Sequence, residues 1–226
     1  MRRVPRLHVI TDEARLASAR FVEDAAAVLE AGGAHVALHL RGRTTEARRL
    51  FDLATALLPV ARATGAVLIV NDRVDVALTA RADGVQLRED SLDVAHARVI
   101  LGEAALIGVS RHVGSEAAVD GADFVLFGAI WPTASHPGRT PAGLRALSEF
   151  GARAGLQAQG SGASGVRRQA SETAVRLIGI GGITPVRVAE VMAAGAYGVA
   201  VLSGIWGVGT KAVHDYVAAL KRHAVF

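Results

Sequence analysis

Short runs of apolar, mostly β-branched residues alternate along the chain with longer Ala-, Leu- and Arg-rich stretches whose apolar residues recur at helical spacing. The runs predict eight strands, at 7–11, 35–41, 66–72, 83–87, 106–110, 124–130, 177–183 and 197–205. The stretches predict eight helices, at 17–31, 45–63, 73–80, 92–101, 114–120, 141–154, 185–194 and 210–222. Because the apolar runs are nearly continuous, we expect parallel strands that are covered on both faces.

Eight strand–helix units in a chain of 226 residues predict a (β/α)8 TIM barrel, as a single domain over residues 1–226. Gly-Ala pairs in AGGAHV, GADFV and AGAYGV support this fold, because the chain must turn sharply there from a helix into a strand. A doubly wound open sheet is the alternative. It requires a Gly-rich turn after the first strand, and ITDEARL contains none.

A stretch at about 155–174, GLQAQGSGASGVRRQASETA, interrupts this alternation. It is rich in Gly, Ser, Ala and Gln and lies between the sixth predicted helix and the seventh strand. We interpret it as a flexible insertion on the N-terminal face of the barrel. It is not a domain linker, because the last two strands follow it and must close the same barrel.

Composition narrows the classes of function. Apolar residues make up 51% of the chain, which is enough for a sizeable core and argues against disorder. Cys is absent, which excludes disulfides, thiolate metal sites and cysteine nucleophiles. The lysines are Lys211 and Lys221, so a Schiff base on a central strand is not expected. The N-terminal apolar run is too short for a signal peptide or a membrane span, which predicts a cytoplasmic protein with no membrane partner.

The net charge of +4 raises the question of nucleic-acid binding. The positive charge comes almost entirely from arginines that are scattered among the predicted helices, without a Lys/Arg run or interleaved aromatic residues. This pattern is typical of solvated helix faces. We therefore expect no nucleic-acid partner.

In a barrel of this kind, catalytic and binding residues collect at the C-terminal ends of the strands. Here these ends are consistently polar. They carry Thr11, Asp12, His39, Arg41, Arg43, Asn71, Asp72, Gln86, Arg88, Glu89, Asp90, Ser110, His112, Thr133, Ser135, His136, Gly181, Gly182, Ser203 and Gly204.

Two of these positions have specific alternatives. His39 and Arg41 alternate along one strand and share a face. We favour the barrel mouth for both, where they would hold an anion, because an outward-facing Arg would be buried beneath helices at high cost. Asp72 precedes a predicted helix, so it is either an N-cap or a ligand for a metal or another cation.

The sixth strand runs into a loop, WPTASHPG, that is rich in Pro, Gly and hydroxyl residues. Thr133, Ser135 and His136 either form a surface turn or contact a ligand, and the residues leave both interpretations open. Lone loop histidines such as His112 and His136 are more often solvent-exposed than catalytic.

The last two strands predict a phosphate site. Gly181 and Gly182 end one strand, and Thr184-Pro185 is a typical helix start. Bare glycine amides beside a helix N-terminus attract a phosphate, and the next strand adds Ser203 and Gly204. The alternative is tight packing of the glycines against a helix. We expect a small-molecule phosphate ester as substrate.

Taken together, these residues resemble the thiamine phosphate synthase/TenI superfamily. The resemblance rests on LHVITD, HLRGR, VNDRVDVAL, ADGVQL, IGVSRH, ADFVLFG, PTAS and IGGITPVRVAEVMAAGAYGVAVLSGI, and only the 155–174 stretch falls outside it. It implies a (β/α)8 barrel, cytoplasmic thiamine biosynthesis and a thiazole phosphate at the glycines of the last two strands. It also implies a homo-oligomer, most commonly a dimer.

The superfamily includes a synthase, which joins a pyrimidine pyrophosphate to the thiazole phosphate through a pyrimidine carbocation and needs magnesium. This chain matches its motifs at Asn71, Asp72, Ser110, Thr133 and Ser135.

This chain also departs from the synthase pattern. The synthase usually has Gln where His39 stands, and Lys where Arg43 and His136 stand. Its second magnesium aspartate aligns with Ser91, although Asp90 is adjacent and could substitute. Neutral His136 removes a charge from the pyrophosphate site, whereas Arg43 keeps its charge and can bind bidentately.

The other branch, TenI, shifts a proton on a thiazole carboxylate phosphate, with an acid–base group and no metal. Its matches here are HLRGR, Gln86, LFG and SGI. The histidine that is its base falls at Ala129, so His39 or His136 would have to serve. Because the departures from the synthase pattern fall on its pyrophosphate and magnesium positions, we lean slightly towards a TenI-type tautomerase without a cofactor. The alternatives are a Mg-dependent synthase and a non-catalytic binder of thiazole or thiamine phosphate.

The predicted site follows from these arguments. The candidate catalytic residues are His39, Arg41, Ser110 and His136. The candidate ligands of substrate or phosphate are Arg43, Asn71, Thr133, Ser135, Gly181, Gly182, Ser203 and Gly204. Asp72 and Asp90 would hold Mg only in a synthase.

Overall fold

A closed parallel barrel forms the centre of the computed structural model, which describes residues 3–115, 119–133, 138, 140–156 and 174–223. The strands lie in sequence order, and β1 pairs with both β2 and β8. They are β1 (Leu7–Ile10), β2 (Val36–Leu40), β3 (Val67–Asn71), β4 (Gly84–Leu87), β5 (Leu106–Arg111), β6 (Phe124–Gly128), β7 (Arg176–Ile180) and β8 (Gly198–Val201).

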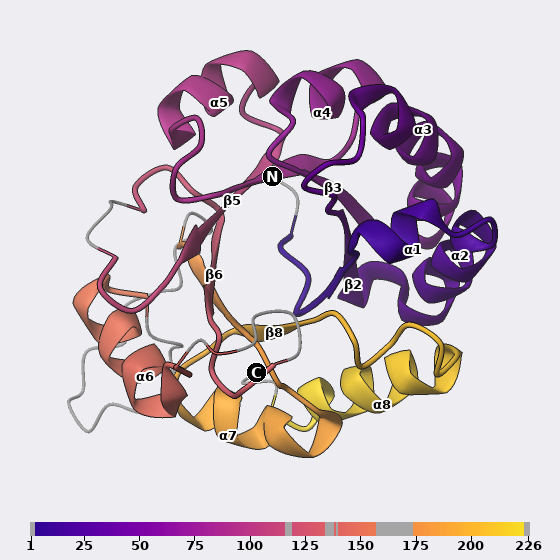
Figure 1. Ribbon diagram of the computed structural model, residues 1–226. Helices are drawn as coiled ribbons and strands as arrows, with labels where there is room; N and C mark the ends of the chain where they lie inside the picture. Colours follow the sequence, from indigo (N-terminus) through magenta and orange to yellow (C-terminus); the bar gives the residue numbers. More distant parts are fainter. Residues whose placement is uncertain (1–2, 116–118, 134–137, 139, 157–173, 224–226) are drawn as a thin grey trace.

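Helices surround the strands (Figure 1). They are α1 (Glu13–Ala17), α2 (Phe21–Gly32), α3 (Ala47–Thr64), α4 (Val74–Ala80), α5 (Val94–Leu101), α6 (Gly143–Arg153), α7 (Val188–Ala193) and α8 (Thr210–Lys221), with 3₁₀ turns η1 (Gly33–His35) and η2 (Pro185–Arg187). The predicted (β/α)8 TIM barrel is confirmed.

The strands are buried on both faces, as the continuous apolar runs predicted. In β2, Leu38 and Leu40 pack in the layer between strands and helices, whereas Ala37 packs inside the barrel. All three are fully buried. Burying a Leu side chain stabilises the fold by about 1.5–3 kcal/mol, so this two-sided burial is the main source of stability.

Two aspartates tie the starts of strands to their neighbours. The Asp83 carboxylate accepts a hydrogen bond from the backbone N–H of Leu68 at 2.8 Å, and the Asp123 carboxylate accepts one from Ile107 at 2.7 Å. Arg98 of α5 also pairs with Asp123 at 2.8 Å. The sequences RADGV and GADFV therefore mark the turn into a strand and also join that strand to the preceding one.

The first helical region differs from the prediction of one helix over 17–31. Asp12 caps α1, where its side chain accepts a hydrogen bond from Arg15 N at 2.9 Å. Ser18 is extended, with ψ 134°, and ends α1, so α2 begins only at Phe21. The apolar periodicity missed this break because both helices bury their apolar face against the same barrel.

The helix predicted over 114–120 is wrong for those of its residues that the structure describes, none of which is helical; 116–118 lie outside the described residues. Here the Ser115 hydroxyl accepts a hydrogen bond from His112 N at 2.9 Å, a local side-chain contact that competes with helix formation.

Most of the predicted insertion at 155–174 lies outside the described residues, which resume at residue 174. Within the part of the chain that the structure describes, no helix has the length and apolar character needed to cross a membrane.

Candidate active site

Polar side chains from three neighbouring strands meet inside the C-terminal end of the barrel. Asn71 of β3 pairs in register with Gln86 of β4, and Gln86 Nε2 donates to Ser110 Oγ of β5 at 3.0 Å. These side chains face inward, because their sequence neighbours pack in the outer layer, namely Val70, Leu87 and Val109. Gln86 Oε1 is buried and has no hydrogen-bond partner in the structure.

His39 lies one layer deeper in the barrel than these polar side chains and has no exposed surface. Its Nδ1 is 3.3 Å from Asn71 Oδ1, and its Nε2 is 2.8 Å from Nδ1 of His8. Burial lowers the pKa of His39 well below its ordinary value, and the neighbouring His8 lowers it further. The structure therefore places this candidate catalytic residue one layer beneath the mouth.

The loop after β2 carries the two predicted arginines. Arg41 is half-buried, and its backbone N–H donates to Thr11 Oγ1 at 2.7 Å, which fixes the end of the strand. Arg43 is exposed, and the loop beyond it is held by the Glu13 carboxylate, which accepts from Thr44 N at 2.5 Å. Burial lowers the pKa of Arg41, and the positive charge of Arg43 contributes in the same direction. The carboxylates of Asp12 and Glu13 act in the opposite direction, so negative charge is favourable beside Arg41.

The two predicted metal ligands are connected by an arginine. Arg88 Nε lies 2.8 Å from Asp72 Oδ2 and 3.4 Å from Asp90 Oδ1. Asp72 adopts φ 65°, the left-handed region that Asp tolerates better than most residues. The N-cap alternative for Asp72 is wrong, because α4 begins at Val74 with Arg73 at its N-cap.

The two carboxylates of Asp72 and Asp90 fit magnesium, provided that the ion displaces Arg88. Both carboxylates pair with Arg88. They are accessible enough to exchange its guanidinium for a metal ion, since 26% of the Asp72 side chain and 78% of the Asp90 side chain are exposed. Among the described residues, no group of three or more acidic, His or Cys side chains could hold a metal. Magnesium typically binds one or two carboxylates and completes its octahedron with water and phosphate oxygens, which matches this arrangement.

The predicted phosphate glycines also meet the loop after β6. A Cβ atom at Gly181 would lie 2.5 Å from Ala129 Cβ, and one at Gly182 would lie 2.7 Å from Trp131 Cβ. Both glycines have positive φ, 103° and 65°. Close packing of these glycines is thus real, but the partner is the β6 loop and not the helix that the alternative named.

A side chain from η2, directly before α7, joins the β6 and β7 loops. Arg187 Nη1 donates to Gly182 O at 2.7 Å, and its guanidinium lies 4.8 Å from the centre of the Trp131 ring. The chain after Thr184 begins with the 3₁₀ turn η2 and continues as α7, which spans only 188–193. A phosphate here would depend on loop amides more than on a helix dipole.

The loop after β8 packs against a tyrosine that also contacts the loop after β7. A Cβ at Gly204 would lie 2.4 Å from Tyr216 Oη, and this hydroxyl donates to Ile183 O at 2.9 Å. Burial raises the pKa of Tyr216 to about 12, so it remains a donor. Ser203 is exposed beside Gly204. Tyr216 of α8 thus links the loops after β7 and β8, which the prediction assigned to one phosphate.

The β6 loop is described only in part. Thr133 is half-buried at its start, whereas Ser135 and His136 lie outside the described residues. The prediction of a catalytic role for His136 therefore stays a prediction.

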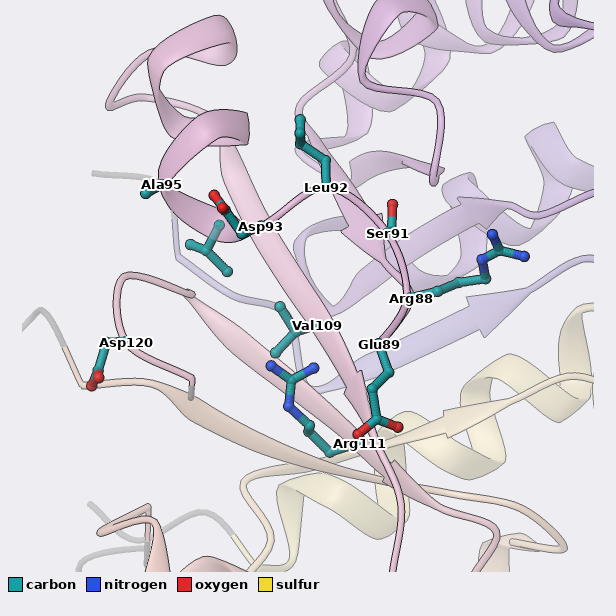
Figure 2. A pocket seen from close by; sticks show the side chains of 10 residues that line it. Arg88, Glu89, Ser91, Leu92, Asp93, Ala95, Val109, Arg111 and Asp120 are labelled. Atoms are coloured by element: carbon teal, nitrogen blue, oxygen red, sulfur yellow. The ribbon is translucent and has the colours of Figure 1, made fainter. Parts of the chain in front are cut away.

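A pocket of about 320 Å³ lies on the outer side of β5, where Val109 and Arg111 reach it. Figure 2 shows the Arg111 side chain in this pocket with Glu89 near it. Burial lowers the pKa of Arg111, and the Glu89 charge acts in the opposite direction. None of the predicted site residues lines this pocket.

Sequence reasoning missed two residues of the site. Arg88 was recognised as a polar strand-end residue but given no role, although a basic residue two positions before Asp90 was a usable signal. His8 was missed because it lies within a strand, and the search covered strand ends. A histidine inside an otherwise apolar run, LHVI, was the available signal.

Comparison with known proteins agrees with this geometry. A chain from Methanoculleus marisnigri named thiamine-phosphate synthase is 38% identical over 95% of this chain and 96% of its own length. One of the same name from Laribacter hongkongensis is 40% identical over 85% of this chain and 84% of its own. These names support the synthase alternative and not the lean towards a TenI-type tautomerase.

Solved structures agree on the fold. A thiamine phosphate pyrophosphorylase from Pyrococcus furiosus superposes with a TM-score of 0.72 and 26% identity, covering 97% of both chains. A phosphoribosyl anthranilate isomerase from Thermus thermophilus has a TM-score of 0.57 at 17% identity over 97% of this chain and 100% of its own, which supports the barrel alone. The family model described as thiamine monophosphate synthase matches residues 7–205, and the chain therefore belongs to this family.

Proposed function

We propose that this protein is a thiamine phosphate synthase, which couples a pyrimidine pyrophosphate to a thiazole phosphate. The observation that carries the proposal is a cluster of arginines beside two carboxylates at the mouth. Burial lowers the pKa of Arg41, and the charges of Arg43 and Arg88 act in the same direction against those of Asp12 and Glu13. Asp72 and Asp90 pair with Arg88.

This charge arrangement suits the departure of a pyrophosphate. In the reaction, the bond between the pyrimidine methylene carbon and the pyrophosphate oxygen breaks, and a bond forms from that carbon to the thiazole nitrogen. Negative charge grows on the departing oxygen, and fixed positive groups in a partly desolvated site stabilise it strongly. Arg41 is the half-buried member of the cluster and would act with the least solvent screening.

Magnesium would be held by Asp72 and Asp90, and when bound it supplies further positive charge to the pyrophosphate. The carboxylates have no evident use in a tautomerase, which needs no metal. They therefore support the synthase over the tautomerase.

The thiazole phosphate would lie at the loops after β7 and β8. Gly181 and Gly182 present backbone without side chains, and Ser203 adds an exposed hydroxyl. The Tyr216 hydroxyl donates to Ile183 O in the loop after β7 and lies against Gly204 in the loop after β8. This support fixes the spacing of the two loops, which a phosphate that bridges them requires.

Of the two histidines that could serve as the base of a tautomerase, His136 lies outside the described residues. His39 has no exposed surface, and both of its ring nitrogens lie at hydrogen-bonding distance from His8 and Asn71. A general base must reach the proton that it removes. This geometry favours the synthase.

The test is a two-substrate assay in which thiamine phosphate and pyrophosphate are measured separately. We expect equal amounts of both products with Mg²⁺ and none with a chelator. Asp72→Asn should lower the rate at least tenfold, whereas Asp52→Asn on the outer helix α3 should leave it unchanged. Failure to form thiamine phosphate would refute the proposal. Conversion of thiazole carboxylate phosphate would then indicate the tautomerase, and binding without turnover would indicate a silent binder.

We further propose a homo-oligomer, with a dimer as the expected state, in the cytoplasm. Size-exclusion chromatography with light scattering tests the first point, and a mass of one chain would refute it.

A further inference from the structure

Two histidines form a buried hydrogen-bonded line inside the barrel, and it ends at the mouth. His8 Nε2 lies 3.0 Å from the carbonyl oxygen of Pro5, and His8 Nδ1 lies 2.8 Å from His39 Nε2. His39 Nδ1 then lies 3.3 Å from the side-chain oxygen of Asn71. Both rings are fully buried. The proposed chemistry makes no direct use of either ring.

The first contact decides where the protons are. A carbonyl oxygen only accepts, so His8 Nε2 must carry the hydrogen that it shares with Pro5. In a neutral His8, Nδ1 is then an acceptor, and His39 must donate to it from Nε2. In a neutral His39, this leaves Nδ1 as an acceptor that faces Asn71.

An acceptor on His39 cannot bond to the oxygen of Asn71. Two arrangements resolve the conflict. Either one of the two rings carries an additional proton and is an imidazolium, so that His39 Nδ1 is protonated, or the Asn71 amide turns by half a rotation and presents Nδ2. The oxygen and nitrogen of an amide have nearly the same shape, so the second arrangement needs no change in packing.

The surroundings favour the neutral pair. Phe124 lies against both rings, with centroid distances of 4.8 Å to His8 and 6.1 Å to His39. Apolar side chains of the barrel interior, including Ile10 and Ile69, pack in the same cluster as Phe124. Burial lowers the pKa of His8 to about 4 and lowers that of His39 as well. An imidazolium here would be a buried charge without a carboxylate partner, which is costly.

We propose that His8 and His39 are positioning residues that hold the Asn71 amide with Nδ2 donating to His39 and Oδ1 directed towards the barrel mouth. The mouth then presents a hydrogen-bond acceptor at Asn71. Such a group binds an N–H or O–H donor and repels a phosphate oxygen. Asn71 Oδ1 therefore accepts from an N–H or O–H group of the substrate, and the second hydrogen of Nδ2 remains available to another acceptor.

The assignment to a substrate rests on the proposed function, whereas the proton arrangement does not. It can therefore be tested on the protein without substrates. Long-range ¹H–¹⁵N correlation spectra distinguish the two neutral tautomers of a histidine ring and the imidazolium. The two buried rings are identified among the eight histidines by their through-space contacts with Phe124.

For the wild-type protein at pH 7, we expect both rings in the Nε2–H tautomer. A His39 ring that is protonated at Nδ1, alone or together with Nε2, would overturn the proposal. This result is independent of turnover, so a failed synthase assay leaves it unaffected.

A pair of isosteric variants sharpens the test. The ionised carboxylate of Asn71→Asp offers only acceptors, so it should force a proton onto His39 Nδ1 and change the tautomer signals of that ring. Asn71→Leu removes the partner without demanding a proton, and it should leave His39 in the Nε2–H tautomer. An unchanged His39 spectrum in a folded Asn71→Asp protein would also overturn the proposal.

Discussion

Replacing Arg88 with Gln should strengthen the binding of a divalent metal to the protein without substrates. A metal at Asp72 and Asp90 must displace the Arg88 guanidinium, which lies 2.8 Å from one carboxylate oxygen and 3.4 Å from the other. More than half of the Arg88 side chain is exposed, at 56%, so each pair contributes only about 0.2–1 kcal/mol. A total on the order of 1 kcal/mol corresponds to about a fivefold decrease in the metal Kd.

The assay is the electron paramagnetic resonance signal of free Mn²⁺, titrated against protein at constant, low ionic strength. The matched control is Arg73→Gln, which removes the same charge next to Asp72 in the sequence. Arg73 pairs with Asp75 instead, so its removal should change the Kd by less than twofold. Added salt should reduce the effect of Arg88→Gln, because screening weakens exposed pairs.

Three results would refute this reasoning. Unchanged or weaker Mn²⁺ binding by Arg88→Gln would show that Arg88 does not compete with the metal. An equal gain in both variants would show that only net charge matters. Absence of Mn²⁺ binding in every variant would remove Asp72 and Asp90 as metal ligands.

Three further predictions concern the interior. The free energy of unfolding should fall by about 3 kcal/mol from pH 6.5 to pH 4 through His8 alone. The reason is that the native pKa of His8, about 4, lies below the ordinary 6.5, so the unfolded chain binds the proton first. Urea unfolding that is equally pH-dependent in His8→Phe would contradict this. Tyr216→Phe should cost about 1–2 kcal/mol, since it leaves the buried Ile183 carbonyl without its 2.9 Å donor; an unchanged urea midpoint would argue against that bond. Gly108→Ala should cost about 1–3 kcal/mol, because its Cβ would lie 2.2 Å from Phe124 Cζ; a melting temperature equal to that of the wild type would show that the ring gives way freely.

The residues at the strand ends show how much of the site could be predicted from the sequence. The apolar–polar transitions located Asn71, Asp72, Arg41 and Ser110 at the mouth, because parallel strands in a closed barrel all end at one rim. These transitions did not distinguish side chains at the rim from side chains buried one layer deeper. The sequence placed His39 and Arg41 together at the mouth, yet His39 lies fully buried and Arg41 only half-buried.

The helical prediction failed where local side chains decided the backbone. Ser18 ends α1, and Ser115 bonds to His112 N in place of a helical turn. Apolar spacing carries no information about such contacts, since hydroxyl groups are compatible with either backbone.

By itself, the sequence determined the alternation of strands and helices, the closed barrel and the membership of a family, because apolar period, turn residues and motif order are local properties of the chain. Only the tertiary structure decided which side chains meet. Arg88 lies 16 residues from Asp72, and His8 lies 31 residues from His39. Those partners are set by the stagger of the strands when the barrel closes, and no local pattern encodes that stagger.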